Sequence, residues 1–594
     1  MLDPREEYAK RLEIHVARVE RRERQHIRLG NAKLAVAAAA IVLIAFYFAK
    51  HIAAYWLLAP LGVFVVLAII HEQVIRARTR ANTAAGYYRQ GFARMDDRWS
   101  GTGATGERFR DPKHVYADDL DLFGTGCLFE LLSTARLPMG EERLAEWLLA
   151  PAPAEGVIER QTLVAELRTR LDLREDLAVA GEALRVRLNP ASLTKWCEGE
   201  TWLGGPVMRA AAAGLSVAAM ATGCYFFATL RHWPVLGVLF LDAIVYSWLQ
   251  KRARAAIAGV SSNAEGLQLF SKILRRIERE PFESAQLKQL AAGLREGAEP
   301  ASEAIARFAR IAAWIDGQDG LMARLLDLPF LYTVQTGMAA EAWRKRHGQR
   351  MRRWIDTVAE IEALLSLAAY SFEHPADPFP EFAAETGSPP HFDAEELGHP
   401  LIPAERCVRN SLRLDEKTRV LLLSGSNMSG KSTLLRTVGI NAVLAQAGAP
   451  VRAKRLRMSP VSLGTRLHSA DSLQEGRSTF YTEVLRIRQV LDLAGGRSIL
   501  FLFDELLDGT NSHDRRIGAE SLLRAFLERG AIGIVTTHDL ALTEMTASLG
   551  PAVRNAHLQD YVENGQMRFD YKVRDGVVTK SNALELMRLA GLDV

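Results

Sequence analysis

The chain has 594 residues, enough for several domains, and its 74 Lys and Arg residues against 70 Asp and Glu residues leave a net charge of +4. So small an excess does not by itself indicate binding to nucleic acid or to acidic lipid. The four cysteines lie too far apart in the sequence for a metal knuckle or a CxxC pair, so we expect free thiols in a reducing compartment. They are Cys127, Cys197, Cys224 and Cys407.

Four apolar segments, arranged in two pairs, interrupt an otherwise polar chain. They cover residues 34–49, 52–70, 210–230 and 233–249. A helix needs about 20 apolar residues to cross roughly 30 Å of hydrocarbon. The second and third segments meet this length, the first is short, and the fourth contains Asp242, which must face another helix or snorkel. We predict two transmembrane helical hairpins, at 34–71 and 206–250, with buried core helices as the alternative.

Basic residues flank each pair of apolar segments on the outside. They are Arg18, Arg21, Arg22, Arg24, Arg28 and Lys33 before the first pair, Arg76, Arg78 and Arg80 after it, Arg209 before the second pair, and Lys251, Arg252 and Arg254 after it. Because positive charge is retained on the cytoplasmic side, both ends of each hairpin are expected there. The sequence thus predicts a multi-pass protein of the inner (cytoplasmic) membrane, with its C-terminal part in the cytoplasm.

The remaining segments have helical spacing up to a Pro-rich linker that ends near residue 390. We predict a basic cytoplasmic helix at 1–33, a helical core region at 72–205, and a helical lever region with the linker at 251–385.

Beyond the linker, residues 386–594 alternate short β-rich runs with helical ones, as is typical of a parallel α/β sheet. Strands are expected at 420–423, 498–503 and 531–536, and helices at 433–447 and 517–529. The predicted fold class is therefore α/β for this C-terminal domain, which follows an all-α region that carries the two hairpins.

The stretch "GSNMSGKS" between the first expected strand and helix fits the pattern G-x-x-x-x-G-K-[ST]. Its glycines let backbone N–H groups surround a phosphate, and the following helix directs its positive N-terminus at the anion. Lys431 is expected to bind the outer phosphates, and the Ser432 hydroxyl to ligate Mg²⁺. The candidate nucleotide-binding residues are Gly425, Ser426, Asn427, Met428, Ser429, Gly430, Lys431, Ser432 and Thr433.

Two further strands end in residues that suit nucleotide hydrolysis. The strand "SILFLF" is followed by Asp504 and Glu505, of which the first is expected to hold Mg²⁺ together with Ser432 and the second to polarise the attacking water. The strand "AIGIVTT" is followed by His538, for which a γ-phosphate sensor is weighed against a structural role. We therefore predict an ATPase that uses ATP and Mg²⁺, with Glu505, His538 and Lys431 as catalytic residues.

The stretch "EGRSTFYTE" suggests that a second helix contributes to the nucleotide site. Ser478 and Thr479 precede an expected helix that contains Glu483, so they are placed to cap its N-terminus, where phosphate can dock. The chain's own loop already occupies one side of the nucleotide. This second helix end is therefore expected from another subunit, which implies a homodimer with Ser478 acting in trans.

The C-terminal part resembles the MutS family of DNA mismatch-repair ATPases. The similarity lies in "SGSNMSGKST", "GRSTFYTE" in place of a transporter-type LSGGQ, "FDELLDGTNSHD", "TTHDL" and "GHPL", and more weakly in residues 128–167. The resemblance implies an ABC-type ATPase dimer. Residues Asn427, Lys431, Ser432, Asp504, Glu505 and His538 would form one subunit's site, Ser478 would complete the partner's site, and 508–511 would lie at the dimer seam.

Three features depart from the pattern of that family. A basic helix and an apolar hairpin stand where the family has a mismatch-binding domain with a Phe-x-Glu wedge, and the second hairpin lies where it inserts a DNA clamp. Cys407 stands where an aromatic residue often stacks on adenine. These departures leave the DNA role open.

The basic stretch "RKRHGQRMRR" at 344–353 permits three interpretations: contact with DNA phosphates, a solvated helix face, or contact with anionic lipid headgroups. The leading hypothesis is a membrane-anchored MutS-like ATPase whose dimer closes on ATP and moves helical levers that engage duplex DNA, including mismatched DNA, in repair. The alternative is a membrane scaffold that uses ATP to switch partner binding without a DNA role. An ABC transporter subunit fits less well, because four spans are few for a pore.

Overall fold

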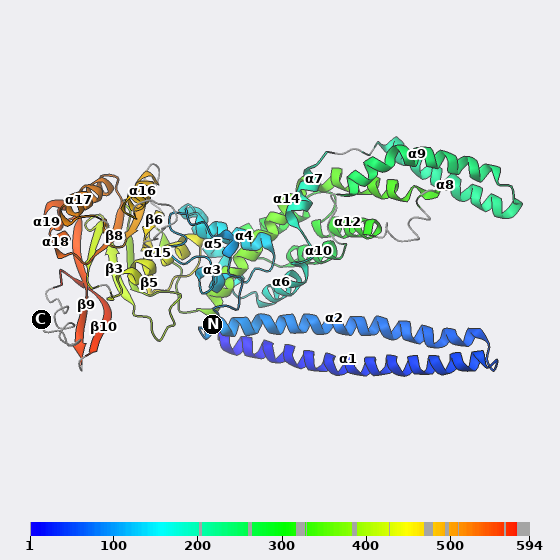
Figure 1. Cartoon of the computed structure of the whole chain (residues 1–594), viewed down its shortest axis with the longest axis horizontal. Helices are drawn as coiled ribbons and strands as arrows, with labels where there is room; N and C mark the ends of the chain where they lie inside the picture. Colours follow the sequence, from blue (N-terminus) through cyan, green and yellow to red (C-terminus); the bar gives the residue numbers. More distant parts are fainter. Residues whose placement is uncertain are drawn as a thin grey trace. The chain divides into compact units, whose positions relative to one another are not determined.

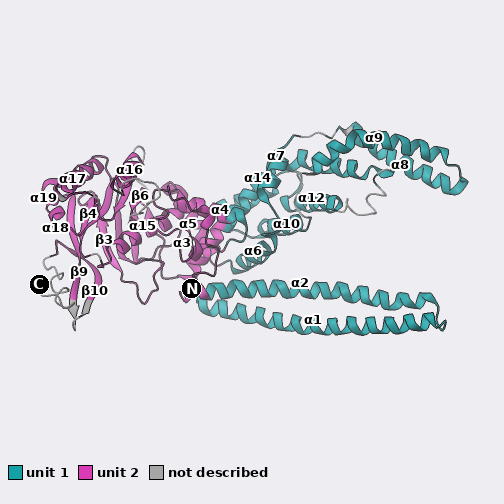
Figure 2. Cartoon of the chain, viewed as in Figure 1, with its two compact units in different colours: residues 1–92, 135–140, 170–362 teal, residues 93–134, 141–169, 363–594 magenta. Residues whose placement is uncertain are grey.

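The computed structural model describes residues 2–200, 203, 205–258, 264–316, 327, 329–382, 389–426, 428–467, 479–493, 498–508, 510–563 and 566–578. They form two compact units: residues 1–92, 135–140 and 170–362 make up the first, and residues 93–134, 141–169 and 363–594 the second (Figure 2). The units do not follow the predicted segment boundaries, because residues from the N-terminal third belong to the unit that contains the sheets. All four cysteines are free.

The first unit begins with a long helical hairpin. Helices α1 (Pro4–Phe48) and α2 (Leu58–Met95) lie side by side and are joined by a turn that includes the short 3-10 helix η1 (Ala54–Leu57) (Figure 1). Asp3 caps α1 by accepting a hydrogen bond from the backbone N–H of Arg5 at 3.0 Å. The predicted basic helix and the first apolar segment are therefore one continuous helix.

Buried polar contacts fix the base of this hairpin to α6 (Leu171–Leu184). The guanidinium of Arg174, which is 2% exposed, donates to the Tyr8 hydroxyl at 2.5 Å. The Tyr88 hydroxyl donates to Glu175 at 2.6 Å. Because such groups are costly to bury unpaired, these contacts specify how the hairpin meets the helical body of the unit.

A second hairpin is formed by α8 (Pro206–Thr229) and α9 (Trp233–Ala258), which lie side by side in Figure 1. Its base packs against α14 (Tyr332–Glu373) through a buried apolar cluster. The cluster consists of Leu203, Ala212, Leu249, Ala253, Ala256, Leu331, Val334 and Met338. The other helices of this region are α7 (Pro190–Glu198), α10 (Ala264–Arg279), α11 (Ala285–Arg295) and α12 (Ala301–Asp316).

Among the residues that the structure describes, four helices are long and apolar enough to cross a membrane. They span Pro4–Phe48, Ala54–Met95, Val207–Thr229 and Trp233–Ile257, and their apolar windows are only 0%, 6%, 11% and 11% buried within the described structure. Asp242 in the fourth helix is fully buried, so its carboxylate does not face the exterior of the hairpin.

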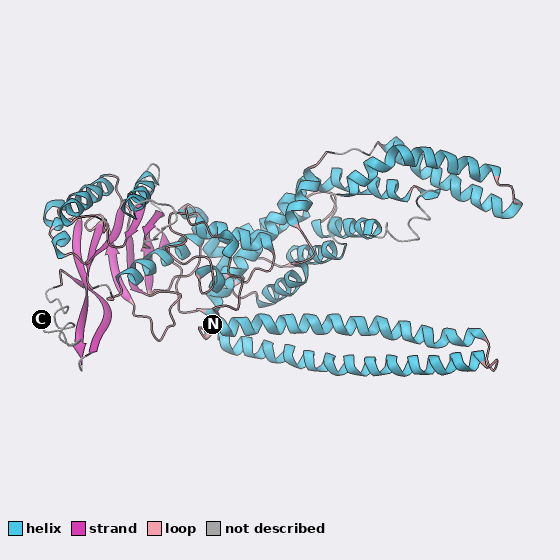
Figure 3. Cartoon of the chain, in the orientation of Figure 1, coloured by secondary structure: helices cyan, strands magenta, loops and turns pink. Residues whose placement is uncertain are grey.

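The second unit contains short helices and two sheets (Figure 3). Its N-terminal helices are η2 (Glu107–Phe109), α3 (Leu128–Leu132), most of α4 (Pro138–Leu149), and α5 (Ala154–Leu167). A four-stranded sheet has the order β1 (Glu381–Phe382), β5 (Arg455–Met458), β2 (Phe392–Leu397) and β3 (Asn410–Leu414). The six-stranded sheet has the order β10 (Gln566–Asp575), β9 (Val553–Glu563), β4 (Val420–Ser424), β8 (Ile532–Thr537), β7 (Ile499–Phe503) and β6 (Ser462–Arg466).

The six-stranded sheet is parallel except for β10, which pairs antiparallel with β9. All residues of β4, β7 and β8 are buried, as expected for strands covered on both faces. Gly533 in β8 permits this packing, because a Cβ atom there would lie 2.5 Å from the Phe501 carbonyl oxygen. The predicted strands and their parallel arrangement are confirmed.

The helices that follow these strands complete the unit: α15 (Lys431–Ala447), α16 (Thr479–Asp492), α17 (Ser512–Glu528), α18 (Leu540–Thr543) and α19 (Met545–Leu549). The chain leaves β4, β7 and β8 at the same edge of the sheet, where open α/β sheets bind ligands. Except for Ser478, the predicted site residues follow these three strands.

Candidate functional site

The loop between β4 and α15 has the backbone conformation that its glycines predict. Gly425 has φ +155° and Gly430, immediately before α15, has φ +91°. A Cβ at Gly430 would lie 2.9 Å from the ring of Tyr571, so a side chain there would be both strained and obstructed. The Ser429 hydroxyl donates to the Ser426 carbonyl oxygen at 2.8 Å and closes the turn.

Lys431 is held inside the loop. Its amino group donates hydrogen bonds of 2.8 Å to the carbonyl oxygens of Gly425 and Ser426, and the residue is 3% exposed. Burial lowers the pKa of the ammonium, and the charges of Glu505 and Asp504 oppose that shift. A cation in this position can bind phosphate oxygens that approach the N-terminus of α15.

The residues predicted to hold Mg²⁺ are in contact. The Ser432 hydroxyl donates to one carboxylate oxygen of Asp504 at 2.5 Å, and the Thr536 hydroxyl donates to the other. Hydroxyl and carboxylate oxygens are the hard ligands that Mg²⁺ prefers, so the donor set fits this ion. Thr536, at the end of β8, was not among the predicted residues.

Glu505 and His538 face each other across the ends of β7 and β8. The Glu505 carboxylate lies 3.2 Å from the Nδ1 atom of His538, and the Glu505 backbone N–H donates to the Thr536 hydroxyl at 2.9 Å. Glu505 has φ +50°, a conformation that is uncommon outside glycine and is often found at functional sites. The loop after β7 therefore holds this carboxylate next to Asp504, one of the residues predicted to hold Mg²⁺.

An internal ion pair supports the backbone that carries the two acids. Arg466, at the end of β6, donates to the Asp504 carbonyl oxygen at 2.8 Å and lies 3.2 Å from the Glu483 carboxylate. Glu483 also accepts a hydrogen bond from the Leu507 N–H at 2.8 Å. Burial raises the pKa of Glu483, and Arg466 opposes that shift. Helix α16 thus helps to set the conformation of the loop after β7.

A cavity of about 370 Å³ adjoins the phosphate loop, within the size range of ligand sites. Its lining consists of Leu397, His399, Ile402, Arg406, Cys407, Val408, Asn410, Met428, Gly430, Lys431, Ser432, Thr433, Leu434, Thr437, Leu558 and Tyr571. Burial lowers the pKa of His399 to about 4, so its imidazole is neutral at pH 7. One end of the cavity thus offers phosphate ligands and the remainder is largely uncharged.

Tyr571 provides an aromatic surface in this cavity, which Cys407 cannot. A bulge in β10 lets Tyr571 adopt φ +56°, and the Asn410 side chain donates to its carbonyl oxygen at 2.9 Å. No sequence pattern indicated that Tyr571 lines this cavity, because it lies about 140 residues beyond the phosphate loop in an ordinary strand pattern.

Replacing Tyr571 with alanine is expected to weaken ATP binding about 3- to 10-fold, because an aromatic contact contributes roughly 0.5–1.5 kcal/mol. Tyr571→Phe should retain the affinity. Tyr561→Ala is a matched control, since Tyr561 is equally exposed, at 42% against 43%, but does not line the cavity. Equilibrium binding of a fluorescent ATP analogue measures the effect, and equal losses in the two alanine variants would contradict the assignment.

The structure places Ser432 against Asp504 and Glu505 against His538, while Lys431 bonds to the carbonyl oxygens of the preceding loop. The catalytic and Mg²⁺-binding roles expected of these residues stay predictions. Ser426 and Ser429 hold the turn of the loop, while Met428, Gly430 and Thr433 line the cavity. Asn427 and Ser478 lie outside the described residues, so their predicted roles stay predictions.

The unit contains a strand, a glycine loop closed around a lysine, a helix, and acids at the end of another parallel strand of the same sheet. This combination defines a domain of the P-loop ATPase class. Within that class, residues 421–594 match the family model described as MutS domain V. Residues 421–594 therefore form a domain of the MutS family.

Three curated relatives illustrate the extent of the similarity. The chain is 38% identical over 202 residues to "Endonuclease MutS2" of Thermus thermophilus, which covers 33% of this chain and 25% of the relative. It is 32% identical over 251 residues to "DNA mismatch repair protein MutS" of Geobacillus kaustophilus, and this match covers 42% of this chain and 28% of the relative. It is 33% identical over 262 residues to "DNA mismatch repair protein MSH6" of Arabidopsis thaliana, and this match covers 41% of this chain and 20% of the relative. The matches thus span about a quarter of the length of these relatives.

Proposed function

We propose that this chain is a membrane-anchored ATPase of the MutS family, in which ATP binding closes a dimer of the C-terminal domains and hydrolysis reopens it. The observation that carries the proposal is the juxtaposition of Ser432, Asp504, Glu505 and His538 beside a loop that encloses Lys431. The family match supports the same chemistry.

Each residue of the site has a role in this proposal. Lys431 binds the outer phosphates, and Ser432 with Asp504 would hold Mg²⁺, which neutralises phosphate charge. Glu505 accepts a proton from the attacking water, and His538 contacts the terminal phosphate while its Nδ1 orients the Glu505 carboxylate. The dimer would add Ser478 from the partner subunit.

The exposed apolar surface of the two hairpins supports membrane anchoring. Large side chains on them are more than half exposed, among them Phe48, Phe227, Trp233, Phe240 and Trp248. Burial of such surface is favourable by roughly 25 cal/mol per Å², and helices of this length and composition match the hydrocarbon thickness. Lipid would cover these faces, whereas a buried core helix would already be covered by protein.

The membrane topology can be tested by labelling cysteines in intact cells that express the full chain with Cys127, Cys197 and Cys224 replaced by serine. Lys50→Cys and His232→Cys place a thiol in the turn of each hairpin, and both should react with a membrane-impermeant maleimide from outside. Native Cys407 should react only after lysis. Recovery of the chain in the carbonate-soluble fraction would refute the anchoring.

A DNA role is the second element of the proposal. Two of the relatives described above carry names that contain DNA mismatch repair, and this supports coupling of the ATPase to duplex DNA. The alternative, an ATP-driven membrane scaffold, gains support from the basic stretch at 344–353, because several of its arginines are engaged within the protein. Arg344 pairs with Glu341 at 3.0 Å, and Arg353 pairs with Glu296 at 2.5 Å.

These two functions predict different results in a salt-titrated binding assay of the full chain in nanodiscs with homoduplex and mismatched DNA. A DNA role requires ATP-dependent affinity that falls steeply with salt, because phosphate contacts release counterions. Affinity that does not respond to ATP, or no binding at low salt, would favour the scaffold.

A further inference from the structure

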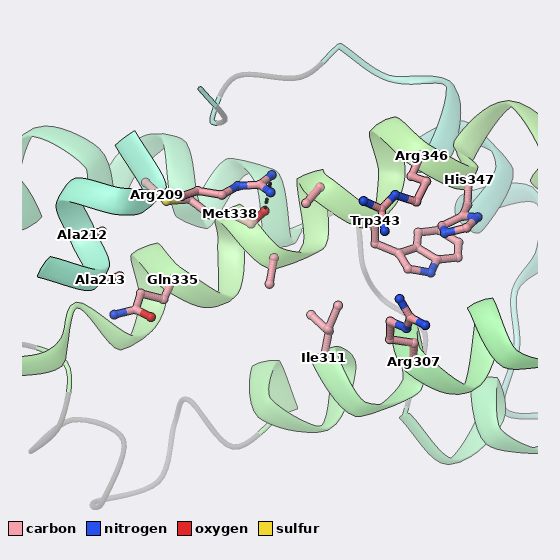
Figure 4. A pocket seen from close by; sticks show the side chains of 12 residues that line it. Arg209, Ala212, Ala213, Arg307, Ile311, Gln335, Met338, Trp343, Arg346 and His347 are labelled. Carbon is pink, nitrogen blue, oxygen red and sulfur yellow. Dashed lines mark hydrogen bonds between the residues drawn. The ribbon is translucent and has the colours of Figure 1, made fainter. Parts of the chain in front are cut away.

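A second cavity lies at the base of the second hairpin, between α8, α12 and α14 (Figure 4). Its volume is about 450 Å³, and all of its lining residues belong to the first unit. This volume falls within the range of small-molecule sites. The cavity is distinct from the nucleotide cavity, since the two share no lining residue.

Three arginines and one histidine line this cavity, and none of the described lining residues is acidic. Neither Arg209 nor Arg346 forms an ion pair with any residue that the structure describes, although Arg209 donates to the Met338 carbonyl oxygen at 3.2 Å. Arg307 pairs with Glu299 at 2.6 Å and remains half exposed. Guanidinium groups of like charge around one space repel each other, and an anion between them relieves that repulsion.

His347 adds a buried polar group to the wall of the cavity. The residue is 2% exposed, and its Nε2 atom lies 3.0 Å from Glu299. Its Nδ1 atom is buried without a hydrogen-bond partner among the described residues. Buried polar atoms are normally satisfied, so this side chain favours a ligand or a water in the cavity.

The rest of the lining is apolar or uncharged: Ala212, Ala213, Ile311, Gln335, Met338, Ala339, Ala342 and Trp343. Figure 4 shows Arg346 and His347 near Trp343, whereas Arg209 lies beside Met338 and Ala212. The cavity therefore combines cationic groups with an apolar wall, which suits a ligand that carries a phosphate next to hydrocarbon.

The position of the cavity along α8 identifies the source of such a ligand. Arg209 lies two residues after Val207, where the third candidate span begins, and Ala212 and Ala213 belong to the same apolar segment. In the proposed topology this end of α8 meets the cytoplasmic leaflet, whose surface is negative. Basic pockets between helices at that level are suited to phospholipid headgroups.

We propose that this cavity binds the phosphate headgroup of an anionic phospholipid, with Arg209 and Arg346 as the principal phosphate ligands and the apolar wall against the upper part of the acyl chains. The proposal rests on the proposed membrane anchoring. Bound lipid would fix α8 against α14, the long helix that continues to Glu373 in the second unit.

The test uses the full chain reconstituted in nanodiscs of phosphatidylcholine with or without a minor fraction of phosphatidylglycerol. Native mass spectrometry counts the lipids that stay bound to the chain after it is released from the nanodiscs. We expect phosphatidylglycerol to be retained over phosphatidylcholine, and the double variant Arg209→Gln/Arg346→Gln to lose that preference about tenfold, because charge-assisted hydrogen bonds contribute roughly 1.5 kcal/mol or more. Nucleotide binding by the variant confirms that it is folded.

The matched control is Lys251→Gln/Arg252→Gln, which removes two charges from the same flank of the second hairpin but outside the cavity. This control should keep the preference. Equal losses in the two double variants, or no preference in the wild-type chain, would overturn the lipid site. Displacement of phosphatidylglycerol by millimolar-range inorganic phosphate would instead assign the cavity to a soluble phosphate compound and overturn the lipid assignment.

The same experiment separates this proposal from the membrane anchoring. A chain that fails to enter discs of phosphatidylcholine alone refutes the anchoring, and the lipid site with it. A chain that enters these discs but shows no preference for phosphatidylglycerol refutes the lipid site alone.

Discussion

Replacing Glu505 with glutamine is expected to lower ATP turnover by at least about 100-fold and to leave ATP binding intact. An amide of nearly the same shape cannot accept a proton from the attacking water, and a positioned general base contributes roughly 10²–10⁴-fold to the rate. The backbone N–H of residue 505 still donates to the Thr536 hydroxyl, so the loop after β7 keeps its conformation.

Phosphate release under single-turnover conditions and equilibrium binding of an ATP analogue measure the two effects separately. Glu528→Gln is the matched control, because Glu528 is an exposed residue at the end of α17 and lies outside the site. Turnover at the wild-type rate in the Glu505 variant would remove this residue from catalysis. Loss of ATP binding in the same variant would show that Glu505 contributes to the affinity for ATP.

Replacing Lys431 with alanine is expected to weaken ATP binding about 10- to 100-fold. Hydrogen bonds to charged groups contribute roughly 1.5–3 kcal/mol, and every 1.4 kcal/mol is a factor of ten. The ammonium is already enclosed by the loop, where it bonds to the carbonyl oxygens of Gly425 and Ser426. Phosphate therefore meets a cation that needs little reorganisation.

Lys417→Ala provides the control for this variant, because Lys417 is exposed in the turn before β4. Titration with an ATP analogue, with and without Mg²⁺, reports the affinity, and circular dichroism checks that the variant is folded. Unchanged affinity in the Lys431 variant would mean that the nucleotide binds elsewhere than at the loop.

The sequence alone determined the phosphate loop and the ends of the two neighbouring strands. The loop is contiguous, so Gly425, Gly430 and Lys431 act through local backbone geometry that any strand–loop–helix unit reproduces. Asp504 and His538 could also be placed, because the carboxyl ends of parallel strands meet at one edge of the sheet. The pattern of charges and apolar runs likewise indicated both hairpins as candidates for the membrane.

Only the tertiary structure decided which distant side chains complete each site. Tyr571 reaches the nucleotide cavity through a bulge in β10, and Arg466 meets Glu483 across β6 and α16. Residues 93–134 and 141–169 join the C-terminal unit, although their helical pattern resembles that of the segments around them. Arg344 and Arg346 are neighbours in one basic stretch, yet the first is buried in an ion pair and the second lines a cavity. Composition gives the charge of a segment, whereas the direction of each side chain depends on how the helix packs, and that packing is set by contacts between residues far apart in the chain.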